Sequence, residues 1–236
     1  MNLDHLSEFT TVWAHIQTDG IGQRGNRWIS EPGENLTFSV VLHPTFLPPA
    51  HQYELTKAMA LGVSDWLSEL FVQLQTDKIH IDDTAVKIKW PNDIYVSGRK
   101  ICGILTENRI NTSYETAVCG IGVNVNQIQF GTGAPNATSL AILTGRHYEL
   151  RKLLTDLLKC LQTRYGQLRS KPGVATLDRD YLSRLLNLGE SHRYLYRGKE
   201  VSAIITGVSQ WGLLRLTSST GEHLECGMKE IEYIWR

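Results

Sequence analysis

The chain has 236 residues, 42% of them apolar, and its 24 Lys and Arg residues balance 24 Asp and Glu residues. This length predicts one large or two small domains with a buried core, and the absence of a basic excess argues against a DNA-binding protein. Four dispersed cysteines and an N-terminus without signal-peptide blocks exclude a zinc-finger-type site and lead us to expect reduced thiols in the cytoplasm.

Two strands are predicted in the first part of the chain, at residues 9–16 and 36–43. They are joined by a long, polar, Gly-rich connection at residues 18–34, and such loops between core strands are often functional. After Pro48-Pro49 the apolar residues follow the helical period as far as Leu70, which predicts a helix that covers the sheet.

The middle of the chain predicts a short strand at residues 86–90 and a hairpin of 94–96 and 100–107. Another strand is expected at 114–125. Residues 116–145 carry no charge at all, but their many Asn, Gln and Gly residues exclude a membrane helix. This stretch suits either a strand that leads into a ligand-covering loop or a neutral surface loop.

The last third predicts two helices and then a change to short strands. Apolar residues from Leu150 to Leu168 indicate an amphipathic helix, and a second helix is expected at 174–186. Short strands separated by turns follow Gly189 and predict a small barrel. We therefore expect an α+β fold with a mixed, mainly antiparallel sheet flanked by helices in domain 1–188, and a small β-barrel in domain 189–236.

The run from Gly20 to Trp28 reads Gly-Ile-Gly-Gln-Arg-Gly-Asn-Arg-Trp. Glycines let backbone N–H groups approach a ligand and form an anion-binding nest. Arg24 and Arg27 would add phosphate contacts, and Trp28 would stack on a ring or wall it off. The spacing matches neither a P-loop nor a dinucleotide-binding fingerprint, and a plain mobile loop is the alternative.

Two lysines, Lys89 and Lys100, are the candidate cations for an anionic ligand, although either could be merely solvated. Lys100 is favoured because an apolar strand surrounds it. Gly103 lies three residues further on, so an ideal strand places it on the opposite face, where its missing side chain would permit close backbone approach. Asp93 would hold a ribose, an ammonium group or magnesium, or only stabilise its turn.

Cys102 is expected to be a small apolar filler and not a nucleophile, because its strand looks buried and no His or Asp lies near it in sequence to activate it. Asn124 and Asn126 point to one face of an ideal strand, where an amide could read an adenine edge. A bulge with capped backbone groups is the competing interpretation.

Together these stretches resemble the biotin–protein ligases. The similarity covers nearly the whole chain, and the matching runs are Gln17-x-x-Gly20-x-Gly22, residues 28–39, Lys89-Trp90-Pro91-Asn92-Asp93, Arg99-Lys100-x-x-Gly103-Ile104-Leu105, residues 120–126, residues 137–140 and residues 227–231. The resemblance implies a catalytic fold like that of class II synthetases with a C-terminal SH3-like barrel. The sequence departs from some members of the family in lacking an N-terminal winged-helix DNA-binding domain, so we expect a monofunctional enzyme and not a repressor.

The resemblance further implies a reaction in two steps. Biotin attacks the α-phosphate of ATP to give biotinyl-adenylate, which a lysine on the biotin carrier domain of acetyl-CoA carboxylase, or of a related biotin-dependent carboxylase, then attacks. Mg²⁺ would be held mainly by phosphates, with few protein ligands, and Asp93 would hold the ATP or its metal. Lys100 and Arg24 would be catalytic, and the expected biotin- and ATP-binding residues are Gln17, Gly20, Gly22, Gln23, Trp28, Lys89, Asn92, Asp93, Gly103 and Asn124.

Two departures from the family pattern leave alternatives open. The Ser-Thr-Asn motif expected upstream of Gln17 is missing, and the usual Gly-Arg-Gly-Arg loop reads Gly20-Ile21-Gly22-Gln23. A lipoate or octanoate ligase or transferase of the same fold is one alternative. A truncated, non-catalytic relative that binds biotin or the carrier is another. Exposed strand edges would permit a homodimer or pairing with the carrier.

Overall fold

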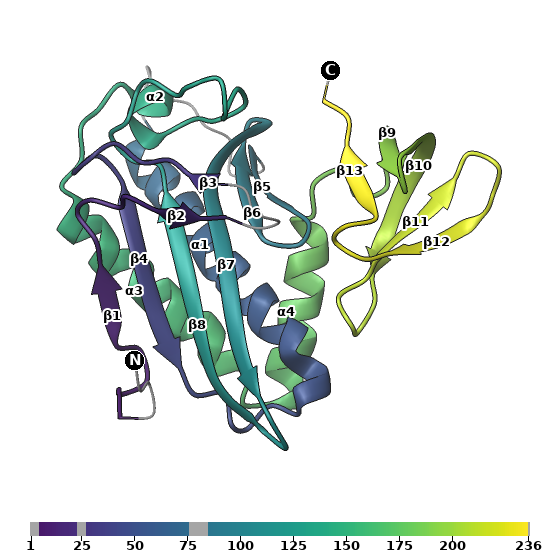
Figure 1. The fold of residues 1–236 in the computed structure, drawn as a ribbon, viewed down its shortest axis with the longest axis horizontal. Helices are drawn as coiled ribbons and strands as arrows, with labels where there is room; N and C mark the ends of the chain where they lie inside the picture. Colours follow the sequence, from purple (N-terminus) through teal and green to yellow (C-terminus); the bar gives the residue numbers. More distant parts are fainter. Residues whose placement is uncertain (1–4, 23–26, 76–84, 236) are drawn as a thin grey trace.

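The computed structural model describes residues 5–22, 27–75 and 85–235 (Figure 1). It contains a six-stranded sheet of order β1-β4-β8-β7-β6-β5 and a five-stranded sheet of order β12-β11-β10-β9-β13. Neighbouring strands in both sheets pair antiparallel. The predicted α+β class, with a mainly antiparallel sheet flanked by helices and a β-rich C-terminal part, is confirmed.

The strands of the large sheet are β1 (Thr11–Trp13), β4 (Leu36–Leu42), β5 (Val86–Lys89), β6 (Asp93–Val96), β7 (Arg99–Ile110) and β8 (Tyr114–Val123). The small sheet contains β9 (Ser191–Tyr196), β10 (Lys199–Val208), β11 (Leu214–Ser218), β12 (His223–Cys226) and β13 (Ile231–Tyr233). A short ribbon pairs β2 (Gly20–Ile21) with β3 (Arg27–Trp28). The helical segments are a 3₁₀ turn (Pro49–His51), α1 (Gln52–Leu74), α2 (Leu140–Thr144), α3 (Leu150–Gln167) and α4 (Lys171–Ser183).

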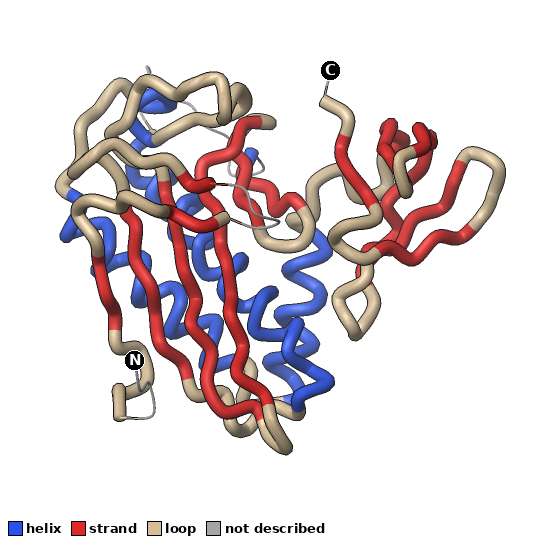
Figure 2. Tube along the Cα trace, in the orientation of Figure 1, coloured by secondary structure: helices blue, strands red, loops and turns tan. Residues whose placement is uncertain are grey.

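Among the described residues, helices cover one face of the large sheet. Figures 1 and 2 show α1 and α3 behind β4, β8 and β7, with α4 to the right of β7, while the β2–β3 ribbon crosses in front of the strands. The burial of the strand residues differs between the two faces in the same way. On β8, every second residue from Ala117 to Val123 is buried against the helices. The residues between them, including Gly120 and Gly122, lie on the open face, where the site is built.

A close approach of α1 and α3 depends on Gly62. A Cβ atom there would come within 2.8 Å of the Leu161 Cδ2 atom and 3.0 Å of its Cα atom. The glycine therefore lets the two helices pack closely against each other. Arg164 adds a buried clamp between three helices, because its guanidinium donates to Asp65 on α1 (2.5 Å) and Asp180 on α4 (2.7 Å).

The differences from the predicted elements have local causes. The second helix of the pair begins at Lys171 and not at 174, because the Ser170 hydroxyl accepts from the Gly173 N–H and caps the helix start. It ends at Ser183, and the next residues instead bond to the edge of β5: the Ile88 N–H donates to the Arg184 carbonyl and the Leu186 N–H to the Ile88 carbonyl. The first strand begins at Thr11 and not at residue 9, since Phe9 has a φ of +64°, and it ends at Trp13.

Other predictions concern the hairpin turn and the C-terminal part. The predicted hairpin turn is confirmed, with Ser97 at φ +48° and Gly98 at φ +77°. The small sheet runs from Ser191 to Tyr233, inside the segment predicted as a barrel, and the division into two domains stays a prediction. No helix among the described residues has the length and apolar character that crossing a membrane requires.

We predict that Gly62→Val destabilises the fold by about 1–3 kcal/mol, because the added methyl groups would overlap Leu161. Urea unfolding followed by circular dichroism measures the change. Gly166→Ala is the matched control on α3, where an added Cβ meets nothing within 4 Å. It should leave stability within about 1 kcal/mol of wild type or raise it. Equal stability of the two variants would contradict the close helix contact.

Candidate functional site

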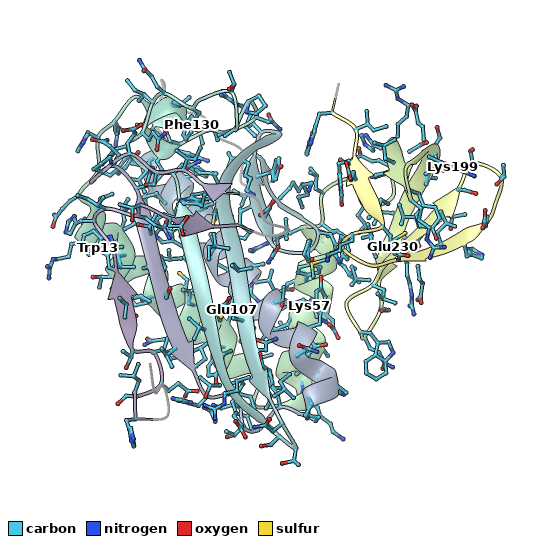
Figure 3. All side chains as sticks on the ribbon, in the orientation of Figure 1. Trp13, Lys57, Glu107, Phe130, Lys199 and Glu230 are labelled. Carbon is cyan, nitrogen blue, oxygen red and sulfur yellow. The ribbon has the colours of Figure 1, made fainter. Side chains whose placement is uncertain are left out.

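A cavity of about 710 Å³ lies on the open face of the large sheet. Its walls come from four parts of the chain: the N-terminal segment with the β2–β3 ribbon, the strands β4, β7 and β8, the turn between β5 and β6, and the C-terminal strand β13. Its volume lies within the roughly 300–1,000 Å³ typical of small-molecule sites. Figure 3 labels Glu107, which lies further down β7 and also lines the cavity.

The floor of the cavity is set by a bulge in β7. Ile94 on β6 pairs with Cys102 while the next residue, Tyr95, pairs with Lys100, so Ile101 is an extra residue on β7. Ile101 and Cys102 are consecutive and both fully buried. Lys100 and Gly103 therefore share the open face. The prediction that Gly103 lies opposite Lys100 was wrong, because it assumed an ideal strand without a bulge.

Lys100 is held at both its backbone and its side chain. Its N–H donates to the Asn136 carbonyl and its carbonyl accepts from the Thr138 N–H, each at 2.8 Å. Its ammonium Nζ lies 2.7 Å from the Asp93 Oδ2 atom. Both side chains keep access to solvent, at 32% and 22% exposure, so the ion pair adds little to stability. Its main consequence is a fixed position for the ammonium group in the cavity.

A pair of glycines makes a flat platform beside Lys100. Gly103 on β7 pairs with Gly122 on β8, and the Trp28 indole lies over both. A Cβ atom at Gly103 would sit 3.2 Å from the Trp28 Cζ3 atom, and one at Gly122 would overlap the ring. The buried Trp28 Nε1–H has no hydrogen-bond partner among the described residues. This nitrogen faces Gly122, 2.8 Å from where a Cβ would stand, so its lack of a partner does not mark a ligand contact.

The β2–β3 ribbon brings the predicted biotin-loop residues together. Gly20 pairs with Trp28, and a Cβ at Gly20 would come within 3.0 Å of the Gln17 Oε1 atom. Gln17, Gly22 and Trp28 all line the cavity. Gly20 supports them from behind and does not line it. Gln23 and Arg24, also predicted here, lie outside the described residues.

The turn that carries Lys89 and Asp93 is anchored from two sides. The buried Trp90 Nε1–H donates to the Gly212 carbonyl of the small sheet (3.1 Å). The Tyr181 hydroxyl of α4 donates to the Pro91 carbonyl (2.7 Å). These bonds fix the turn between the two sheets, so the positions of Lys89 and Asp93 depend on both.

Sequence reasoning missed the contribution of β13 to the site. Ile231, Glu232, Tyr233 and Trp235 line the cavity, and the Lys89 Nζ atom lies 4.6 Å from the centroid of the Tyr233 ring. Burial raises the pKa of the Tyr233 hydroxyl well above its usual value, so the group stays protonated. The only sequence signal was the aromatic pair Tyr233 and Trp235 near the C-terminus.

Two predicted binding residues lie beneath the cavity instead of lining it. Asn92 is buried and its amide donates to the Ile104 carbonyl (2.7 Å). Asn124 is equally buried and its amide donates to the Thr138 carbonyl (3.0 Å). Both amides hold the backbone around β7, and a direct contact of Asn124 with adenine stays a prediction.

Cys102 is a packing residue. It is fully buried, and burial together with the nearby Asp93 carboxylate raises the pKa of its thiol. The described residues contain no cluster of three or more His, Cys, Asp or Glu side chains able to hold a metal ion. The Asp93 carboxylate already accepts from Lys100. The described site thus does not fit a protein-held Mg²⁺, and we derive no step through one.

Comparison with known proteins identifies the family. Residues 1–124 match the sequence model of the biotin/lipoate A/B protein ligase family. The chain belongs to this family. It is 30% identical over 205 residues to the biotin–[acetyl-CoA-carboxylase] ligase of Mycobacterium tuberculosis, which covers 86% of this chain and 71% of that protein. The predicted resemblance is confirmed.

Two further relatives show how much of the fold is shared. The bifunctional ligase/repressor BirA of Bacillus subtilis is 29% identical over 228 residues, and the chain spans 64% of its length. The biotin protein ligase of Aquifex aeolicus, solved in complex with biotin and ATP, has a TM-score of 0.77 at 26% identity. That match covers 98% of this chain and 91% of the Aquifex chain.

We predict that Gly122→Ala displaces the Trp28 indole from the platform, because the new Cβ would overlap the ring. Intrinsic tryptophan fluorescence should change, and the change should vanish in a Trp28→Phe background. Gly120→Ala is the matched control on the same strand and face, since its Cβ would meet only the Leu105 carbonyl oxygen at an ordinary 3.6 Å. Equal fluorescence changes in both glycine variants would show that Trp28 does not rest on Gly122.

Proposed function

We propose that this family member is an ATP-dependent biotin–protein ligase that joins biotin to a lysine of a carrier domain through biotinyl-5′-adenylate. The observation that carries the proposal is the juxtaposition of the Lys100–Asp93 pair with the glycine platform under Trp28. It is supported by the name of the Mycobacterium relative and by the Aquifex structure, which contains biotin and ATP.

The first step brings two anions together. A carboxylate oxygen of biotin attacks the α-phosphorus of ATP, a new O–P bond forms, and the bond to pyrophosphate breaks. The Lys100 ammonium would lie between the carboxylate and the α-phosphate and reduce their repulsion. Because Asp93 and the fixed backbone hold Lys100 in place before the ligands arrive, little reorganisation is needed during the reaction. We assign no step to Arg24, whose predicted catalytic role stays a prediction.

The Trp28 indole suits the apolar part of biotin. Gly103 and Gly122 carry no side chains, so the indole lies against the sheet at van der Waals distance. Trp28 also lines the cavity, where its ring offers an apolar surface, and Gln17 supplies an amide for polar ring atoms. An aromatic wall also keeps water away from the mixed anhydride, which hydrolysis would otherwise destroy.

In the second step a lysine amine of the carrier attacks the biotinyl carbonyl. The C–N bond forms, AMP leaves with the electrons of the C–O bond, and the amine nitrogen releases one proton to solvent. The acceptor we propose is the biotin carrier domain of acetyl-CoA carboxylase or of a related biotin-dependent carboxylase, in accord with the relative's name. Mg²⁺ would accompany the phosphates of ATP. Since the reaction consumes ATP, we expect it to take place in the cytoplasm.

The family also includes lipoate ligases, so membership alone does not select the acid. The motif from Lys89 to Asp93, together with the C-terminal sheet of the chain, favours biotin over lipoate as the substrate. Strand β1 is an edge of the large sheet, and extension there to a homodimer or to the carrier stays a prediction.

ATP–pyrophosphate exchange on the purified chain tests the choice of acid. We predict exchange that depends on biotin, with no significant exchange when lipoate or octanoate replaces it. Exchange with lipoate or octanoate alone would assign the chain to the other branch of the family. A folded sample without exchange for any acid would indicate a non-catalytic relative.

We predict that Lys100→Ala lowers the rate of biotin-dependent exchange about a hundredfold, as loss of one preorganised donor worth ~3 kcal/mol does elsewhere. Its unfolding midpoint should barely change, since the Lys100–Asp93 pair is solvent-accessible. Lys87→Ala is the control, because Lys87 lies on β5 but does not line the cavity. Full activity of Lys100→Ala would overturn the assignment.

A further inference from the structure

In the C-terminal strand β13, which lines the cavity, Tyr233 contacts a charged group. Tyr233 presents its ring to the Lys89 ammonium at 4.6 Å from Nζ to the ring centroid. This is within the ~6 Å range in which the negative face of an aromatic ring attracts a cation. Lys89 and Tyr233 both line the cavity, so the contact places this positive charge beside the Tyr233 ring on the cavity wall.

Tyr233 is itself held by rings from both sheets. It packs edge-to-face on Tyr194 at 5.2 Å and stacks with Trp235 at 6.0 Å. Trp235 in turn stacks on Tyr95 at 5.2 Å with an interplanar angle of 11°. Tyr95 belongs to β6, two residues after Asp93. The aromatic series Tyr194–Tyr233–Trp235–Tyr95 therefore connects the small sheet to the strand that carries Asp93.

The backbone adds to this connection. Tyr233 pairs with Tyr194 in the β13–β9 register, and Trp90, next to Lys89, donates to the Gly212 carbonyl. A flexible four-carbon side chain such as that of lysine loses much conformational freedom when it is fixed. A ring that is already immobile can hold the ammonium in place before the ligand binds, so less of that entropy is lost on binding.

We propose that Tyr233 is a positioning residue, which holds the Lys89 ammonium by a cation–π contact so that it meets the phosphates of ATP. The inference rests on the proposed ligase function and assigns the C-terminal sheet a part in the nucleotide half of the reaction. Biotin binding, which we place at Gln17, Trp28 and the glycine platform, does not depend on Tyr233.

The test measures KM for ATP and KM for biotin separately in the exchange assay. Tyr233→Leu should raise KM for ATP five- to tenfold and leave KM for biotin within twofold. Tyr233→Phe keeps the ring face and should behave as wild type. Trp211→Leu is the matched control on the small sheet, since Trp211 is 60% exposed and does not line the cavity. A normal KM for ATP in Tyr233→Leu, or an equal loss in Tyr233→Phe, would overturn the proposal.

A double-mutant cycle adds a readout that a merely structural role would not move. If Tyr233 acts through Lys89, Tyr233→Leu should cause no further loss in a Lys89→Ala background. Independent, multiplying effects would contradict the proposal. Should Tyr233→Leu fail to fold, fluorinated phenylalanines at position 233 keep the shape and weaken the ring quadrupole stepwise. KM for ATP must then rise with fluorination, and a flat series would refute the cation–π role.

The failure of this inference can be distinguished from failure of the proposed function. If wild type shows no exchange with biotin, lipoate or octanoate, the ligase proposal fails. Calorimetric titration of ATP into wild type, Tyr233→Leu and Tyr233→Phe then tests Tyr233 directly. Weaker ATP binding in the leucine variant alone supports the positioning role, whereas identical binding in all three overturns it.

Discussion

Between Ile94 and Tyr95 the pairing of β6 with β7 skips Ile101, and the site depends on this bulge. It places two consecutive residues, Ile101 and Cys102, in the core and turns Lys100 onto the open face with Gly103. Without it, strand alternation would separate the cation from the platform. At the bulge, the backbone N–H and carbonyl of Lys100 form hydrogen bonds with residues 136 and 138. The loop after β8 therefore satisfies the backbone groups of Lys100.

The two faces of the large sheet differ in the side chains that they carry. One face carries the apolar residues that pack on α1, α3 and α4, while the other carries glycines where Trp28 rests. A face without side chains cannot bury apolar area by itself, and the β2–β3 ribbon and β13 cover it from the two sides. Both covers contribute aromatic rings. Rings bury a large area with little loss of side-chain freedom, which suits a wall that must admit a ligand.

The sequence predicted most elements, because hydrophobic periodicity and turn residues are local signals. The turn residues Ser97 and Gly98 indicated the hairpin of β6 and β7, and the helical period of the apolar residues indicated α1 and α3. It also grouped Gln17, Trp28, Asp93, Lys100 and Gly103, which the structure brings into one cavity. It could not place Gly103 relative to Lys100, since a bulge is set by pairing with a neighbouring strand. Nor could it find Tyr233, because the contact with Lys89 spans 144 positions and depends on how the small sheet packs.

In the proposed function, this cavity supports transfer of biotin to a carrier lysine. Mass spectrometry of a biotin carrier domain incubated with the chain, biotin and ATP measures that transfer. We expect the mass of one added biotinyl group, on a single lysine. This added mass should be absent without ATP and nearly absent with the Lys100→Ala variant. An unmodified carrier after incubation with the folded chain, or equal modification by the Lys100→Ala variant, would contradict the proposed function.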